Sequence, residues 1–142
     1  MKIVDVNVLV YVASLESPQH KTLHHWWISA MNGTESIGLC WHSLVGFVRI
    51  MTNPKILPNP VPLDLCLGRI TSWLELPRTE IIGETDDHWS VFQDILMDAQ
   101  AIGKLSTDAH LAALAISRGA TLVSCDTDFA RFRHLRWENP LV

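Results

Sequence analysis

Three aspartates of this sequence are placed so that their carboxylates could meet at one edge of a parallel sheet. Asp5 ends a strand-like run that begins at Lys2, and Asp126 ends a second run that begins at Leu122. Both runs are short and apolar, as buried parallel strands are, and open α/β sheets bind ligands beyond the carboxyl ends of their strands. Asp108 is expected to open a helix directly before the second run. We therefore expect the three acids to converge in one cleft.

Converging carboxylates indicate a site for a metal ion. Carboxylates within ~4–6 Å of one another raise each other's pKa and oppose folding unless a cation neutralises them. A donor set made only of oxygen atoms suits Mg²⁺ or Mn²⁺ better than zinc. Such an ion lowers the pKa of a bound water and balances negative charge on a leaving oxygen, so the pattern favours hydrolysis of a phosphodiester bond.

Each aspartate taken singly also has a purely structural explanation. An Asp at a strand end or a helix start is commonly an N-cap or a turn former. This explanation accounts less easily for three acids at one sheet edge that also have polar neighbours. The neighbours are Asn7, two residues after Asp5, and Ser124, two residues before Asp126. Both interpretations remain open at the level of the residue pattern.

Strand-like runs alternate along the chain with amphipathic helices that would position these acids. Strands are expected over residues 2–6, 36–40, 80–82 and 121–124, and helices over residues 7–13, 20–31, 42–52, 64–74, 88–101 and 108–118. Asp64 is expected to cap the fourth helix. The alternation is typical of βαβ units, so we predict an α/β fold, a three-layer α/β/α sandwich with a central parallel sheet. Residues 55–62 are rich in proline and are expected to form a surface connection, and residues 128–142 are expected to fold back on the body.

Length, charge and cysteine content limit the class of protein. The 142 residues fit a single domain over residues 1–142, with 48% hydrophobic residues and no run of the ~20 apolar residues that a membrane helix needs. The N-terminus has no signal-peptide pattern, which favours a cytoplasmic location. The three cysteines are widely spaced and predict neither disulfides nor a zinc knuckle. The net charge of −4 argues against direct DNA binding by the chain alone.

Motifs near both ends of the chain resemble those of the PIN-domain ribonucleases. They are IVDVNVLVY at residues 3–11, DAHLAALA at residues 108–115 and GATLVSCDTDF at residues 119–129. The resemblance covers nearly the full length and is closest to the toxin half of bacterial VapBC toxin–antitoxin pairs. It implies a PIN-like α/β/α sandwich and an endoribonuclease that depends on Mg²⁺ or Mn²⁺. It also implies a homodimer, and inhibition by a cognate antitoxin whose segment fills the groove near the acids.

The resemblance also assigns roles to individual residues. Asp5, Asp108 and Asp126 match the family's catalytic, metal-binding acids. Three further residues match polar positions flanking the site, where contacts to water or to the ligands are more typical than direct ligation. These residues are Asn7, Ser124 and Asp128.

One acid of the family pattern is missing from this chain. The pattern usually has a glutamate in the helix after the second strand, and alignment puts Gly46 at that place. Glycine inside a helix costs ~1 kcal/mol relative to alanine, so its presence needs a reason. One hypothesis is that Arg49, and secondarily His42, contact a substrate phosphate beside a site with one carboxylate fewer. The alternative is a solvated arginine and a glycine that permits a close helix crossing.

Two rival functions are compatible with the same residues. A chain without the family glutamate could be a catalytically weak or inactive module that binds RNA or an antitoxin. A small metal-dependent phosphatase is disfavoured, because residues 5–7 lack the second early aspartate of the common aspartyl-phosphate pattern.

Other polar and aromatic groups have a structural explanation beside a functional one. A zinc site at His20 and His24 is disfavoured because no third ligand accompanies them. Tryptophans could stack on unpaired bases, although core or partner contacts are more typical. They are Trp41, Trp73, Trp89 and Trp137. Arg131, Arg133 and Arg136 form a basic cluster that is either a solvated face or a contact to an RNA backbone.

Overall fold

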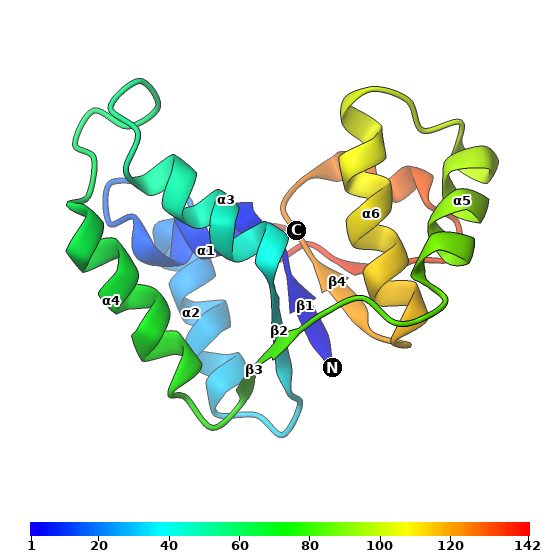
Figure 1. Ribbon diagram of the computed structural model, residues 1–142. Helices are drawn as coiled ribbons and strands as arrows, with labels where there is room; N and C mark the ends of the chain where they lie inside the picture. Colours follow the sequence, from blue (N-terminus) through cyan, green and yellow to red (C-terminus); the bar gives the residue numbers. More distant parts are fainter.

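A sheet of five short strands, all parallel, lies at the centre of the computed structural model, which describes residues 1–142 (Figure 1). The strands are β1 (Lys2–Val4), β2 (Ile37–Cys40), β3 (Thr79–Ile82), β4 (Thr121–Val123) and β5 (Arg136–Glu138), in the order β3-β2-β1-β4-β5. In this order β1 lies between β2 and β4, and Val4 is in register with Val123. The residues that follow these two strands therefore leave the sheet at the same edge.

Helices cover both faces of the sheet, which confirms the predicted α/β/α sandwich. One side carries α1 (Val6–Ala13), α2 (His20–Met31), α3 (Trp41–Met51) and α4 (Leu63–Leu74). The other carries α5 (His88–Ala99), α6 (Lys104–Ser117) and the short 3₁₀ helix η1 (Thr127–Arg131). Figure 1 shows the two groups on opposite sides of the strands. None of the helices is long and apolar enough to cross a membrane.

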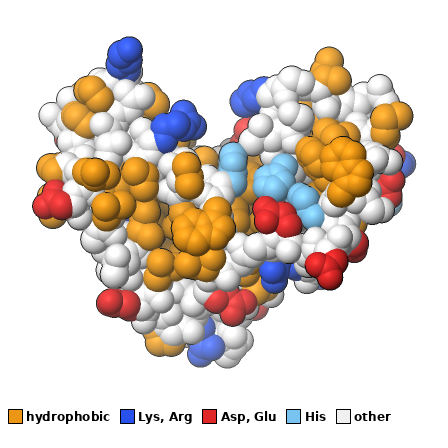
Figure 2. All heavy atoms as spheres, viewed as in Figure 1, with side chains coloured by type: hydrophobic (Ala, Val, Ile, Leu, Met, Phe, Trp, Pro, Cys, Tyr) orange, Lys and Arg blue, Asp and Glu red, His pale blue; other side chains and the backbone are white.

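The alternation of side chains along each strand divides the core in two. Val4 and Val123 pack toward the α1–α4 layer, whereas Ile3 and Leu122 pack toward α5 and α6. Successive strand residues point to opposite faces, so strands buried on both sides need apolar residues at every position. The two helical groups diverge beyond the end of β1, and the surface is hollowed between them in Figure 2.

Two predicted helix starts were wrong. Helix α1 begins at Val6 and not at residue 7, because Asp5 is already its N-cap. Helix α6 begins at Lys104, so Asp108 lies in its second turn instead of opening it. Gly103, with φ +59°, ends the preceding segment, and the Ser106 hydroxyl donates to the Gly103 carbonyl over 2.6 Å. The residues from Lys104 onward can therefore all be helical.

Two further differences concern a cap and a strand. Asp64 does not cap α4, because that helix begins one residue earlier, after Pro62, whose φ of −54° already suits a helix start. Strand β5 was not predicted as a strand. It is three residues long, carries a charged residue at each end, and exists because its backbone pairs with β4. Segments of this kind show no clear hydrophobic periodicity in sequence, and backbone pairing with a neighbouring strand sets their position.

Candidate active site

Asp5 is fixed at the point where β1 ends and α1 begins. Its backbone N–H donates to the Val123 carbonyl over 2.9 Å, which continues the pairing of β1 with β4. One carboxylate oxygen accepts from the Val6 N–H at 2.7 Å, as an N-cap does, and the other accepts from the Ser124 hydroxyl at 2.7 Å. Only 5% of Asp5 is exposed. The carboxylate is therefore held rigidly at the sheet edge.

Asn7 and Ser124 form a polar bridge between the ends of β1 and β4. The Asn7 side-chain amide donates to Asp5 Oδ2 and to Ser124 Oγ, both over 3.1 Å, and its oxygen accepts from the Cys125 N–H at 3.1 Å. Ser124 Oγ also accepts from the Asp126 N–H at 3.1 Å. The structure thus places both residues in contact with Asp5, and through Ser124 it fixes the loop that carries Asp126.

Asp108, Asp126 and Asp128 form the acidic group of the site. One carboxylate oxygen from each lies within 4.8 Å of the others. Asp126 also accepts from the Asp128 N–H at 2.9 Å, so the two acids share one tight turn. Asp108 Oδ2 is buried and receives no hydrogen bond from the protein. Asp128, expected only to flank the site, is thus as well placed for ligation as Asp126, whereas Asp5 lies beside this group.

The electrostatics of the acids agree with this arrangement. Burial, followed by the charges of Asp126 and Asp5, raises the pKa of Asp108, and Lys104 offsets only part of the effect. Burial also raises the pKa of Asp5, although hydrogen bonds from Ser124 and Val6 oppose the shift. An unbonded buried oxygen, an all-carboxylate donor set and mutual repulsion are the features that a divalent cation such as Mg²⁺ or Mn²⁺ relieves. The residues present therefore fit a metal ion.

Gly46 lies at a close crossing between α3 and α1. A Cβ atom at this position would be 3.0 Å from Val6 Cγ2, which is tighter than ordinary packing. The alternative explanation of this glycine, a close helix crossing, therefore holds. On the polar side of α3, His42 and Arg49 line one surface pocket with Gly46 and Val6, and Val6 directly follows Asp5.

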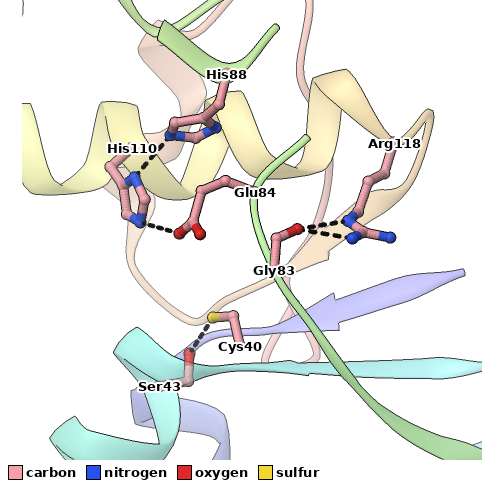
Figure 3. A network of polar contacts seen from close by, with 7 residues as sticks. All are labelled: Cys40, Ser43, Gly83, Glu84, His88, His110 and Arg118. Carbon is pink, nitrogen blue, oxygen red and sulfur yellow. Dashed lines mark hydrogen bonds and ion pairs between the residues drawn. The ribbon is translucent and has the colours of Figure 1, made fainter. Parts of the chain in front are cut away.

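A contact between two histidines, His88 and His110, was not predicted from the sequence. His88 Nε2 and His110 Nδ1 are 2.9 Å apart, and His110 Nε2 lies 3.6 Å from a carboxylate oxygen of Glu84 (Figure 3). The His42 ring lies 6.3 Å from that of His110. Burial and the nearby His88 lower the pKa of His110. The histidines come from α3, α5 and α6, so no local spacing could have grouped them.

The tryptophans and arginines considered in the sequence analysis have different environments in the structure. Trp73 is buried, and the Trp137 indole donates to the Ser124 carbonyl over 3.0 Å, whereas Trp41 and Trp89 are 59% and 68% exposed. Of the predicted basic cluster, Arg133 pairs with Asp98 at 2.6 Å and Arg136 donates to the Gly119 carbonyl. Two of the three arginines are therefore engaged with the protein itself.

Comparison with known proteins agrees with this fold. Residues 2–135 match the PIN domain, and the chain therefore belongs to the PIN-domain family. Ribonuclease VapC37 of Mycobacterium tuberculosis is 36% identical over 140 residues, which cover 99% of this chain and 97% of that protein. The resemblance inferred from the end motifs is thus confirmed.

Solved structures share the whole fold at low sequence identity. VapBC2 from Rickettsia felis, bound to a DNA fragment from its promoter, aligns with a TM-score of 0.68 and 18% identity over 97% of each chain. A toxin–antitoxin complex from Klebsiella pneumoniae aligns with a TM-score of 0.62 and 16% identity, over 99% of this chain and 98% of that one.

Proposed function

We propose that this chain is a metal-dependent endoribonuclease and the toxin of a type II toxin–antitoxin pair. The observation that carries the proposal is the acidic group of Asp108, Asp126 and Asp128, with a buried oxygen of Asp108 that no protein donor reaches. Support also comes from full-length relatives that are named VapC ribonucleases. In a PIN domain, an acidic group at this sheet edge is best explained by hydrolysis of RNA phosphodiester bonds.

The proposal gives each acid a role that follows from its position. Asp108, Asp126 and Asp128 would hold Mg²⁺ or Mn²⁺, and the ion would supply Lewis-acid chemistry, activating water and neutralising charge on the scissile phosphate. Asp5, fixed by Ser124 and by its own cap, would orient the reacting groups at the rim of this cluster. Hydrolysis would leave a 5′-phosphate and a 3′-hydroxyl.

The partners of the chain form a second part of the proposal. A cognate antitoxin would cover the groove beside the acids, and two copies of the chain would form a homodimer in the cytoplasm. Support for the antitoxin comes from the shared fold with a toxin–antitoxin complex. Sedimentation velocity tests the dimer, and a species of 16.0 kDa at every concentration would exclude it.

A cleavage assay tests the enzymatic activity directly. The purified chain should cut a structured RNA such as a tRNA when Mg²⁺ or Mn²⁺ is supplied, and a chelator should stop it. Asp108→Asn and Asp5→Asn should lose this activity. Asp98→Asn should keep it, because Asp98 is exposed and pairs with Arg133, away from the acidic group.

Two outcomes would count against the proposal. Equal cleavage by the wild-type chain and Asp108→Asn would show that a contaminating nuclease or another site is responsible. A chain that binds RNA but never cuts it with either metal would be the inactive binding module, with Gly46 in place of the family glutamate.

A further inference from the structure

A pocket next to Asp5 has the chemistry to bind a nucleotide. Its volume is about 360 Å³, within the range of about 300–1,000 Å³ that small-molecule sites occupy. It lies along the first turns of α3, where that helix crosses the start of α1. Its lining residues are Val6, Trp41, His42, Val45, Gly46 and Arg49.

Gly46 adds no side chain to this pocket. A Cβ at this position would lie 3.0 Å from Val6 Cγ2, and Val6 is itself a lining residue, so a larger residue here would press against this wall. The pocket is bounded here by the glycine and by the apolar side chains of Val6 and Val45.

The pocket walls combine an aromatic face with unpaired positive charge. Trp41 is 59% exposed, and its indole N–H makes no hydrogen bond within the protein. The exposed Arg49 guanidinium has no acidic partner, and no acid lines the pocket. An indole face stacks with any nucleobase, and a free guanidinium fits two phosphate oxygens. A nucleotide offers both groups at once.

The pocket also has a direct structural connection to the acids. Val6, one of its walls, donates its backbone N–H to the Asp5 carboxylate over 2.7 Å. His42, another wall, lies in the first turn of α3, where the neighbouring Ser43 hydroxyl donates to the Val4 carbonyl, one residue before Asp5. A nucleotide in this pocket would therefore sit beside Asp5.

We propose that this pocket binds one unpaired ribonucleotide of the substrate, next to the bond that is cut. The base stacks on Trp41, and its phosphate contacts Arg49, with His42 between the pocket and Asp5. Bases inside a duplex are already stacked on their neighbours and cannot enter such a pocket, so the substrate must be single-stranded at this point. The inference rests on the proposed ribonuclease function and adds the class of RNA that the site accepts.

Binding measured without cleavage separates this inference from the activity itself. All proteins carry Asp108→Asn, and the probe is a short fluorescein-labelled RNA of mixed sequence, used as a single strand and as a duplex with its complement. Fluorescence anisotropy should show tighter binding of the single strand. Adding Trp41→Ala should weaken it by about tenfold, whereas Trp41→Phe should retain most of the affinity. Arg49→Gln should weaken binding and lower the salt dependence by about one phosphate contact.

Trp89→Ala is the matched control, because Trp89 is equally exposed but lies on α5 outside the pocket. Equal single-strand affinity of the Trp41→Ala and Trp89→Ala proteins, or preference for the duplex, would overturn the inference. If Trp41→Ala binds RNA with unchanged affinity but self-associates differently in sedimentation, this surface is instead a contact between copies of the chain.

The same substitutions in the active chain distinguish the two proposals. Trp41→Ala should raise KM with little change in kcat, and its unfolding temperature should stay near that of the parent protein. If Trp41→Ala still cuts RNA with an unchanged KM, the proposed nucleotide pocket is wrong and the proposed ribonuclease function stands. If the chain without these substitutions does not cut RNA, the proposed ribonuclease function is itself wrong.

Discussion

Among the acids of the site, Asp108 is the one least satisfied by the protein. Asp5 accepts from Val6, Asn7 and Ser124, and Asp126 accepts from the Asp128 N–H. Asp108 has a buried oxygen without any donor, and its pKa is raised by burial and by the charges of Asp126 and Asp5. A side chain of this kind opposes folding when it is ionised, so stability does not explain its presence.

This argument predicts how the stability of the chain depends on pH. The raised pKa means that the folded chain binds a proton at Asp108 more tightly than the unfolded chain does. The cost is absent below the ordinary pKa of an aspartate, grows as pH rises toward the folded pKa, and is fully present above it. In chelator at neutral pH, Asp108→Asn should therefore raise the free energy of unfolding by roughly 1 kcal/mol, as substitutions at strained functional sites commonly do. Urea unfolding across acidic and neutral pH measures this, and the gain should shrink as pH falls.

Asp98 provides a control with the opposite sign. Its hydrogen bond with Arg133 lowers the pKa of Asp98, so the ionised carboxylate favours the folded state. Asp98→Asn should leave stability unchanged or slightly lower it at neutral pH, and should not raise it. A stability gain as large as that of Asp108→Asn would mean that reduced net charge, and not the local environment, is responsible.

At the scale of secondary structure, sequence patterns correctly predicted the strands and helices that depend on local residue chemistry. The β-branched runs after Met1 and before Ser124 became β1 and β4, and the helices with a clear apolar period were found within a few residues of their ends. The start of α6 was missed because Ser106, Thr107 and Asp108 are residue types that commonly cap a helix, whereas the helix begins directly after Gly103. Strand β5 and the contact between His88 and His110 depend on pairing across the fold, which no local period records.

The crossing of α1 and α3 yields a prediction about Gly46. Alanine would gain about 1 kcal/mol of helix propensity, but its Cβ would lie 3.0 Å from Val6 Cγ2. The Val6 side chain is stiff because β-branched residues have one preferred rotamer in a helix. Gly46→Ala should therefore lower the free energy of unfolding by about 1–3 kcal/mol, as overpacked positions do. Chemical denaturation measures the change.

Gly68 in α4 is the matched control for this substitution. It is exposed, and a Cβ there would meet nothing within 4 Å. Gly68→Ala should stabilise the chain by up to about 1 kcal/mol, from helix propensity alone. If both alanine variants were equally stabilising, the crossing of α1 and α3 would have room for a Cβ atom, and close packing would not explain Gly46.

At the scale of the whole molecule, the parallel sheet assembles a site from residues more than a hundred positions apart. Asp5 comes from the layer of α1, Asp108 from α6 on the opposite face, and Asp126 from the loop after β4. The convergence of these acids followed from the strand ends, because the carboxyl ends of parallel strands share one edge. The position of Asp128 next to Asp108 and Asp126, and the pocket at Trp41, became apparent only from side-chain geometry.

A cation bound between the two faces of the sheet would neutralise the negative charge of these acids. Calorimetric titration of Mn²⁺ into the purified chain tests this most directly. The account predicts saturable binding by the wild-type chain, retained binding by Asp98→Asn, and loss of binding by Asp108→Asn. Equal Mn²⁺ binding by the wild-type chain and by Asp108→Asn would contradict it.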